Sequence, residues 1–102
     1  MSGLFYDKTN FSADISGWDV SNITNMYSMF FNASSFNQPL HDWNTSSVSD
    51  MSAMFAIALS FNQPLNAWDT SSVTYMDIMF GNASSSKNQM PSELSTLNLV
   101  KV

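Results

Sequence analysis

Hydrophobic and polar positions repeat along this chain with a period of 25 residues. Tryptophan recurs at that spacing as Trp18, Trp43 and Trp68, and Met-x-x-Met-Phe recurs in segments that begin at residues 26, 51 and 76. Between them, Phe-Asn-Gln-Pro-Leu occupies 36–40 and again 61–65. A unit this short cannot bury its own apolar face, so positions that are apolar in every copy predict one continuous core made by stacked units.

Within each unit, the apolar spacing predicts a short helix and a short strand. Met-x-x-Met-Phe-x-x-Ala covers 26–33, 51–58 and 76–83, and it has the i, i+3, i+4, i+7 spacing of an amphipathic helix. The segments 40–45 and 65–70 each follow a proline, which suits the first residue of a strand. We therefore expect an α/β repeat solenoid that is leucine-rich-repeat-like, with about four coils, each containing a short strand and a short helical turn.

The repeats predict a single domain over residues 1–102. A partial repeat covers 1–10, whole repeats cover about 11–35, 36–60 and 61–85, and a divergent C-terminal coil covers 86–102. The register fails where Ser86 replaces the expected phenylalanine. The chain opens one period before Met26, inside a repeat, and no polar cap is evident at either end.

An uncapped stack of this kind exposes core side chains and strand edges, which proteins normally protect. We expect head-to-tail self-association, because two different end surfaces form a heterologous contact that propagates as an open fibre. The alternative is a fragment whose covalent neighbours cover both ends. The predicted interface consists of Met1, Leu4, Phe5 and Phe11 at one end and Leu94, Leu97, Leu99 and Val102 at the other.

The net charge of the chain limits the classes of partner that it is expected to bind. Three lysines, no arginine and eight acidic residues give a net charge of -5, whereas nucleic-acid binding draws its energy from Lys and Arg. No segment approaches the roughly 20 apolar residues of a membrane span, so we expect no membrane insertion. The expected partners are the chain itself and, in addition, a host or cell-surface protein or glycan.

Candidate chemistry is sparse. His41 is the only histidine and there is no cysteine, so neither a zinc site nor a Cys-His dyad can be assembled. We expect no catalytic residue, cofactor or metal, and therefore no enzyme. Asp19, Asn44 and Asp69 share one repeat position and could offer oxygen ligands to Ca²⁺, although side chains that bond to backbone in the following turn are the favoured interpretation.

Two further patterns concern the surface. The tryptophans could form a sugar-binding strip, but a residue present in every repeat favours core packing. Asn-x-Ser/Thr sequons mark glycosylation sites in a secreted eukaryotic chain. They occur at Asn10, Asn22, Asn32, Asn44 and Asn82.

Taken in order, the repeated positions read Trp-Asp-x-Ser-x-Val-Thr-x-Met-x-x-Met-Phe-x-x-Ala-x-x-Phe-Asn-x-Pro-Leu. This motif resembles the repeat of the BspA-like leucine-rich-repeat surface proteins, and it runs from Trp18 to Leu40, from Trp43 to Leu65 and from Trp68 to about Ala83. The resemblance covers residues 1 to about 85. It implies a solenoid, an extracellular or cell-surface location and a role in adhesion, and it carries no catalytic residue with it.

These observations favour a non-catalytic extracellular structural protein that self-assembles head-to-tail into a filament or surface layer, with a role in adhesion. The main alternative is a protein- or glycan-binding adhesin module excised from a longer repeat protein. A third hypothesis is an ice- or crystal-binding face built on Thr45 and Thr70. It is weaker, because Val20 interrupts the threonine column.

Overall fold

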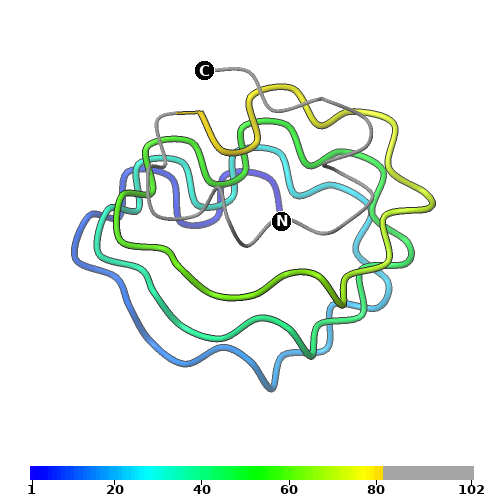
Figure 1. Cartoon of the computed structure of the whole chain (residues 1–102), viewed down its shortest axis with the longest axis horizontal. Coiled ribbons are helices and arrows are strands. Elements are labelled where there is room, and N and C mark those ends of the chain that lie inside the picture. The colour runs from blue at the N-terminus through cyan, green and yellow to red at the C-terminus, as the bar shows by residue number, and fades with distance from the viewer. Residues whose placement is uncertain (82–102) are drawn as a thin grey trace.

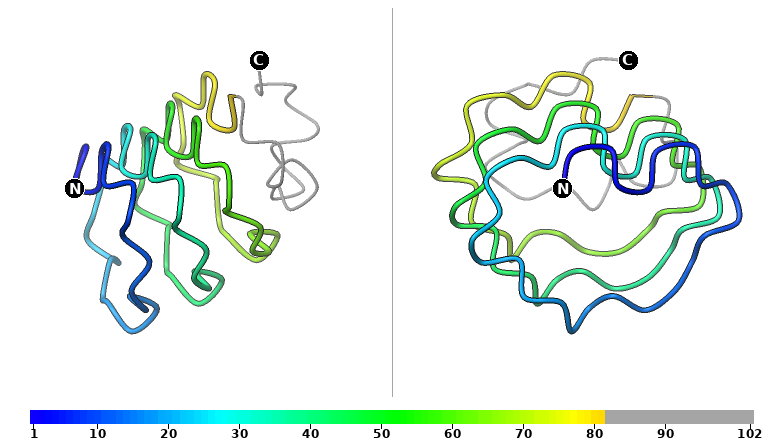
Figure 2. Two further views of the ribbon diagram at one scale, coloured as in Figure 1. Left: turned by 90° about the vertical axis from the view of Figure 1, so that its left-hand side faces the viewer. Right: turned by 180° about the vertical axis from the view of Figure 1, so that it is seen from behind.

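The structure, a computed structural model, describes residues 1–81, in which successive repeats lie on one another as layers. Figure 1 shows the blue, green and yellow segments following the same outline, each displaced from the one before, and Figure 2 shows the layers edge-on. The N-terminus lies at one end of the stack (Figure 2). The layers meet mainly through backbone hydrogen bonds and stacked aromatic rings.

The segments expected to be helical form a run of tight turns instead. In 26–33, alternate N–H groups donate to the carbonyl three residues earlier, as Phe31 does to Ser28 at 3.1 Å. The N–H groups between them donate to the next layer, as Phe30 does to Met54 at 2.8 Å. An α-helix needs each N–H for the carbonyl four residues earlier. Sharing these donors with a neighbouring layer therefore excludes a helix.

Left-handed backbone recurs through the same segments. Ser28 and Asn32 both have φ of 56°, and a residue at this φ every fourth position interrupts a right-handed helix. The N-terminal copy of these two positions holds Gly3 and Asp7, which adopt this region readily. The other members of the two columns are Ala53, Ile57 and Ile78.

The expected strands are also absent from residues 1–81. A turn lies inside 40–45, where the N–H of Trp43 donates to the carbonyl of Leu40 at 3.1 Å. The β-type pairing in the described residues amounts to two isolated parallel bridges, which join Asn25 to Asp50 and Asp50 to Tyr75. Each layer therefore pairs with the next at one bridge, and the rest of its backbone is turn and irregular structure.

The expectation of an α/β, leucine-rich-repeat-like solenoid is thus wrong. Residues 1–81 contain no helix and no strand longer than a bridge. The radius of gyration is 11.9 Å, no larger than the roughly 13 Å of a compact globule of about 100 residues. The repeat period correctly indicated which residues stack, but the layers form a compact globule of turns rather than an elongated array of strands and helices.

Two columns of phenylalanine rings form the centre of the core. In one column, Phe30 stacks on Phe55 with ring centroids 5.2 Å apart and planes 3° from parallel. In the other, Phe36 stacks on Phe61 at 5.9 Å and 5°. The columns also touch each other, with Phe30 and Phe36 at 4.4 Å. Nearly parallel rings at these separations gain more than their buried area alone provides.

The tryptophan column adds a polar link between layers. Trp43 and Trp68 are 3% and 1% exposed. Their indole N–H groups donate to the previous layer, from Trp43 to the Ile15 carbonyl at 3.1 Å and from Trp68 to the Leu40 carbonyl at 2.8 Å. Core packing is therefore confirmed for these two residues, and their buried N–H groups are satisfied, as burial requires. Trp18 differs, because it is 43% exposed.

We expect Phe55→Ala to lower the free energy of unfolding by about 3–5 kcal/mol, the usual cost of removing a large aromatic side chain from a core. Phe55 is fully buried and its ring touches both neighbouring layers, through Phe30 and Phe80. Urea unfolding followed by circular dichroism measures the change. Tyr27→Ala, at a site 47% exposed, is the control and should cost far less. Equal losses at the two sites would refute the stacked core.

Substitutions of Ile78 test whether the backbone at this residue is left-handed. Ile78 has φ of 50° and is 43% exposed, and β-branched residues are disfavoured in this region whereas asparagine tolerates it. We expect Ile78→Asn to be more stable than Ile78→Thr by about 1 kcal/mol, although both substitutions are polar. Melting temperatures of the two variants decide this. If the threonine variant is equally stable, the backbone at residue 78 is not left-handed.

Candidate functional site

The N-terminal face of the stack, which we define by Met1, Leu4, Phe5, Phe11 and Trp18, is the largest departure from the buried pattern of the core columns. Each of these residues is the first member of its column. Leu4 is 45% exposed although its equivalents Met29, Met54 and Met79 are fully buried, and Trp18 is 43% exposed although Trp43 is 3% exposed. Met1, Phe5 and Phe11 are partly buried and pack against the core.

The aromatic side chains of the N-terminal face are already arranged as they are inside the stack. Phe5 lies 4.0 Å from Phe11 and 5.9 Å from Trp18 between ring centroids. The equivalent separations one layer on are 4.4 Å for Phe30–Phe36 and 6.4 Å for Phe30–Trp43. Phe30 has a stacked ring in the layers on both sides, whereas Phe5 has one on the Phe30 side only. The face therefore presents an ordered aromatic surface.

Backbone polarity gives the same face a defined hydrogen-bonding character. Between layers, N–H groups of one turn run donate to carbonyls of the next, at Tyr27, Met29 and Phe31. The equivalent carbonyls in the first layer belong to Ser2, Leu4 and Tyr6, and within residues 1–81 no backbone N–H donates to them. The N-terminal face thus offers a row of acceptors, one at every second residue, beside its aromatic side chains.

The predicted assembly residues are only partly placed by the structure. Met1, Leu4, Phe5 and Phe11 are the first members of their columns, and the rings of Phe5 and Phe11 are stacked. The opposite set, Leu94, Leu97, Leu99 and Val102, lies outside the described residues. Sequence reasoning missed Trp18, which it assigned to the core with the other tryptophans. The available signal was that Trp18 is the first member of its column in this sequence.

The sequon asparagines differ in their surroundings. Asn10, Asn22 and Asn44 are exposed, whereas Asn32 is partly buried and its Nδ2 donates to Asp7 Oδ1 at 3.0 Å. The Asn44 Oδ1 accepts from the N–H and the hydroxyl of Ser46, its own sequon serine. Asn82 lies outside the described residues. Three of the predicted sites are therefore accessible at the surface.

The Asp19, Asn44 and Asp69 column forms capped turns. Asp19 Oδ1 accepts from the N–H of Ser21 at 3.0 Å and from its hydroxyl at 2.6 Å. The same N–H bond recurs from Ser46 to Asn44 and from Ser71 to Asp69. The hydrogen bonds of the turn-bonding interpretation are therefore present at all three positions. Among residues 1–81 no three or more His, Cys, Asp or Glu side chains are grouped as metal ligands would be.

Hydrogen bonding also sets the ionisation of these turn carboxylates. The hydroxyl of Ser21 and then its backbone N–H lower the pKa of Asp19 below its ordinary value. Ser71 lowers the pKa of Asp69 in the same way, and Ser16 lowers that of Asp14. In each case the cause is hydrogen bonds that favour the charged carboxylate.

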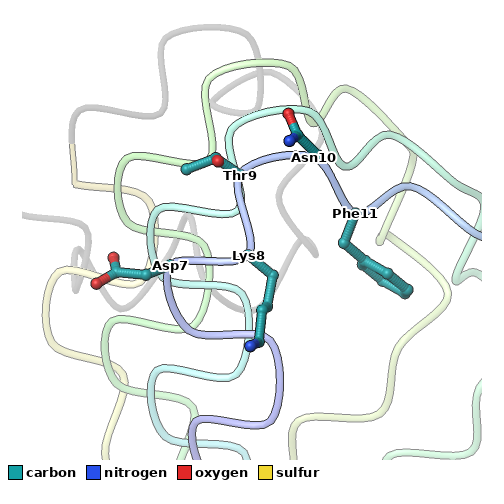
Figure 3. A pocket seen from close by; sticks show the side chains of 5 residues that line it. All are labelled: Asp7, Lys8, Thr9, Asn10 and Phe11. Atoms are coloured by element: carbon teal, nitrogen blue, oxygen red, sulfur yellow. The ribbon is translucent and has the colours of Figure 1, made fainter.

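Other candidate chemistry in the described residues is isolated. His41 and Asp42 are exposed neighbours, with Nε2 and Oδ1 3.4 Å apart. An open depression is lined by Asp7, Lys8, Thr9, Asn10 and Phe11. Figure 3 shows the Asp7 carboxylate, the Lys8 amine and the Phe11 ring pointing in different directions. The depression therefore does not bring acid, base and nucleophile together.

Comparison with known families gives one match. A family described as "Mycoplasma protein of unknown function, DUF285" matches residues 1–96. The chain belongs to the DUF285 family. No curated protein and no solved structure matches it. The DUF285 match spans the partial first repeat and every whole repeat, so the whole layered region just described lies within the matched residues. In residues 1–81 of this DUF285 chain, no helix is long and apolar enough to cross a membrane.

The lowered pKa values of Asp14, Asp19 and Asp69 predict that the folded chain loses stability in acid. Their pKa values are lowered in the folded chain, so their stabilisation is fully present above the unfolded pKa of about 4 and is lost as pH falls through the folded values. The wild-type melting temperature should therefore decline below about pH 4. Replacing Asp14, Asp19 and Asp69 with Asn should flatten this decline, because Asn44 makes the same turn without titrating. An unchanged acid limb would contradict this role.

Proposed function

We propose that this chain is a non-catalytic structural repeat protein that self-assembles head-to-tail into a filament or surface layer. The observation that carries the proposal is the N-terminal face. Its aromatic side chains and carbonyls repeat, group for group, the surface that each inner layer offers to the layer before it. A second copy of the chain supplies matching chemistry, because it is built from the same repeat.

Two physical arguments support the second copy as the occupant. The contact between layers is directional, with N–H donors on one side and carbonyl acceptors on the other, so an end-to-end contact is heterologous and continues indefinitely instead of closing as a dimer. The net charge of -5 opposes stacking only weakly, because charges further apart than about 8 Å are screened at physiological salt.

The place of action proposed here is the outside of the cell, with adhesion as an accompanying role. The repeat motif resembles that of the BspA-like surface proteins, and this supports an extracellular or cell-surface location. The scarcity of lysine and the absence of arginine argue against nucleic-acid partners. The proposal includes no enzymatic activity and no cofactor, because the sequence lacks the residues for the commonest catalytic constellations.

A protein- or glycan-binding adhesin module is the second candidate. Exposed aromatic side chains on the sides of the stack favour it. Tyr6 is 46% exposed and stacks on Phe31 with ring centroids 4.8 Å apart, and Tyr75 is 60% exposed. Rigid, partly exposed tyrosines supply contact area at low entropic cost. This candidate does not require assembly, so the state of the purified chain separates the two.

We expect the purified chain to assemble at tens of micromolar and Leu4→Asp to remain monomeric, because the substitution places a charge in the apolar centre of the contact. Leu59→Asp is the matched control. Leu59 is 49% exposed, like Leu4 at 45%, but it occupies a position that is Thr9 and Ser34 in other repeats. Analytical ultracentrifugation and negative-stain microscopy measure particle size.

Three results are informative in that experiment. Fibres from the wild type and from Leu59→Asp, with monomers from Leu4→Asp, support the proposal. A wild-type chain that stays monomeric at these concentrations overturns it and favours the adhesin module. Assembly that Leu4→Asp leaves intact would move the contact away from the N-terminal face. Leu99→Asp, at the opposite predicted end, should prevent assembly as Leu4→Asp does.

A further inference from the structure

Trp18 is the one tryptophan of the column whose indole N–H has no protein acceptor within residues 1–81. Trp43 and Trp68 donate to the carbonyls of Ile15 and Leu40 in the layer before them. Trp18 has no such layer in the described chain, and it is 43% exposed. An apolar ring with one unsatisfied donor is the group that a partner must match on this face.

The local surroundings of Trp18 resemble those of the two buried tryptophans. Its backbone N–H donates to the Ile15 carbonyl at 3.1 Å and closes a turn. Trp43 closes the same turn by donating to the Leu40 carbonyl, also at 3.1 Å. Its ring lies 5.9 Å from Phe5 at 34°, close to the 6.2 Å and 36° of Trp68 against Phe55. Trp18 therefore keeps the turn and the phenylalanine contact of the buried tryptophans. In the described residues it has neither their indole bond to a preceding layer nor a stacked contact like that of Trp43 with Trp68 at 6.4 Å.

We propose that Trp18 anchors the head-to-tail contact by donating its indole N–H to a backbone carbonyl of a second copy, as Trp43 and Trp68 do within one chain. The proposal rests on the proposed function and adds its specificity-determining residue. Because a tryptophan ring buries much area and its N–H fixes one position, Trp18 sets the register of the contact. Such central aromatic residues commonly dominate binding energy at protein interfaces.

The same geometry assigns the direction of growth. The carbonyls of Ser2, Leu4 and Tyr6 accept and the Trp18 indole donates, so the N-terminal face needs a partner with alternate N–H donors beside one free carbonyl. The surface between layers of this chain has that combination. A second N-terminal face does not, because it would meet acceptors with acceptors. The contact is therefore between unlike ends.

The test compares Trp18→Phe with the wild type in the full chain. Phenylalanine keeps an aromatic ring but removes the N–H, and one hydrogen bond corresponds to about a fivefold change in affinity. We expect the concentration for half-assembly to rise about fivefold, and Trp18→Ala to raise it by more than tenfold. Tyr27→Phe, which removes the hydroxyl of an aromatic residue that is 47% exposed, close to the 43% of Trp18, is the matched control and should leave it unchanged.

Two further readouts separate an anchor from a merely structural residue. The melting temperature of the monomer at low concentration should be the same for Trp18→Phe and the wild type, whereas Trp43→Phe should lower it. Acrylamide quenching of wild-type fluorescence should fall as the chain assembles, because Trp18 becomes covered. Trp18→Phe should show little quenching at any concentration, since Trp43 and Trp68 are buried.

The outcomes also separate this inference from the proposed function. If the wild type assembles without a fall in its acrylamide quenching, and Trp18→Phe assembles at the same concentration, Trp18 is not the anchor and head-to-tail stacking stands. If the wild type does not assemble, both ideas are wrong. A Trp18→Phe monomer with a lowered melting temperature assigns Trp18 a structural role and overturns its role as an anchor.

Discussion

The division of backbone N–H groups between turns and neighbouring layers is the constraint on which the rest of this structure depends. In each turn run, one N–H closes a local turn and the next donates to the adjacent repeat. Buried backbone N–H groups must find acceptors. Here about half of the acceptors for a turn run are carbonyls of the next layer. A single repeat therefore cannot fold alone, and the aromatic columns follow from this stacking.

Because the layers are copies of one repeat, the contacts between successive layers are similar, and the exposure of the core columns differs on the N-terminal face. Inside the described stack, phenylalanine and methionine side chains of the core columns are fully buried because a layer lies on each side. On the N-terminal face the same residue types are exposed or partly buried, and carbonyls that accept elsewhere receive no backbone donor from residues 1–81. The repeat thus makes the end surface resemble a layer boundary that is missing one partner, and this resemblance is the physical basis of the proposed assembly.

The polar residues of the repeat serve the backbone rather than chemistry. Asp19, Asn44 and Asp69 close turns with the serine two residues on, and Asn37 accepts from the Asn62 N–H at 2.8 Å between layers. In each of these residues Oδ1 accepts a backbone N–H at an exposed surface. This use of polar side chains supports the structural role proposed for this member of the DUF285 family.

The sequence by itself determined the period and the membership of the core columns. It could do so because apolar residues at matching positions have to be buried together, whatever backbone carries them. Trp43, Phe30 and Met54 were placed in the core on this ground alone. Trp18 was misplaced for a related reason: its repeat position is a core position, but its exposure depends on whether a layer precedes it.

Only the tertiary structure decided the backbone within each repeat. The spacing of Met26, Met29, Phe30 and Ala33 fits a helix, yet a run of turns with left-handed residues at Ser28 and Asn32 points the same side chains inward. Whether the segment forms a helix or a run of turns depends on which carbonyls accept from its N–H groups. About half of those carbonyls belong to another repeat. The N–H of Phe30 bonds to Met54, a partner that no local pattern specifies, and for that reason the expected α/β architecture was replaced by stacked turns.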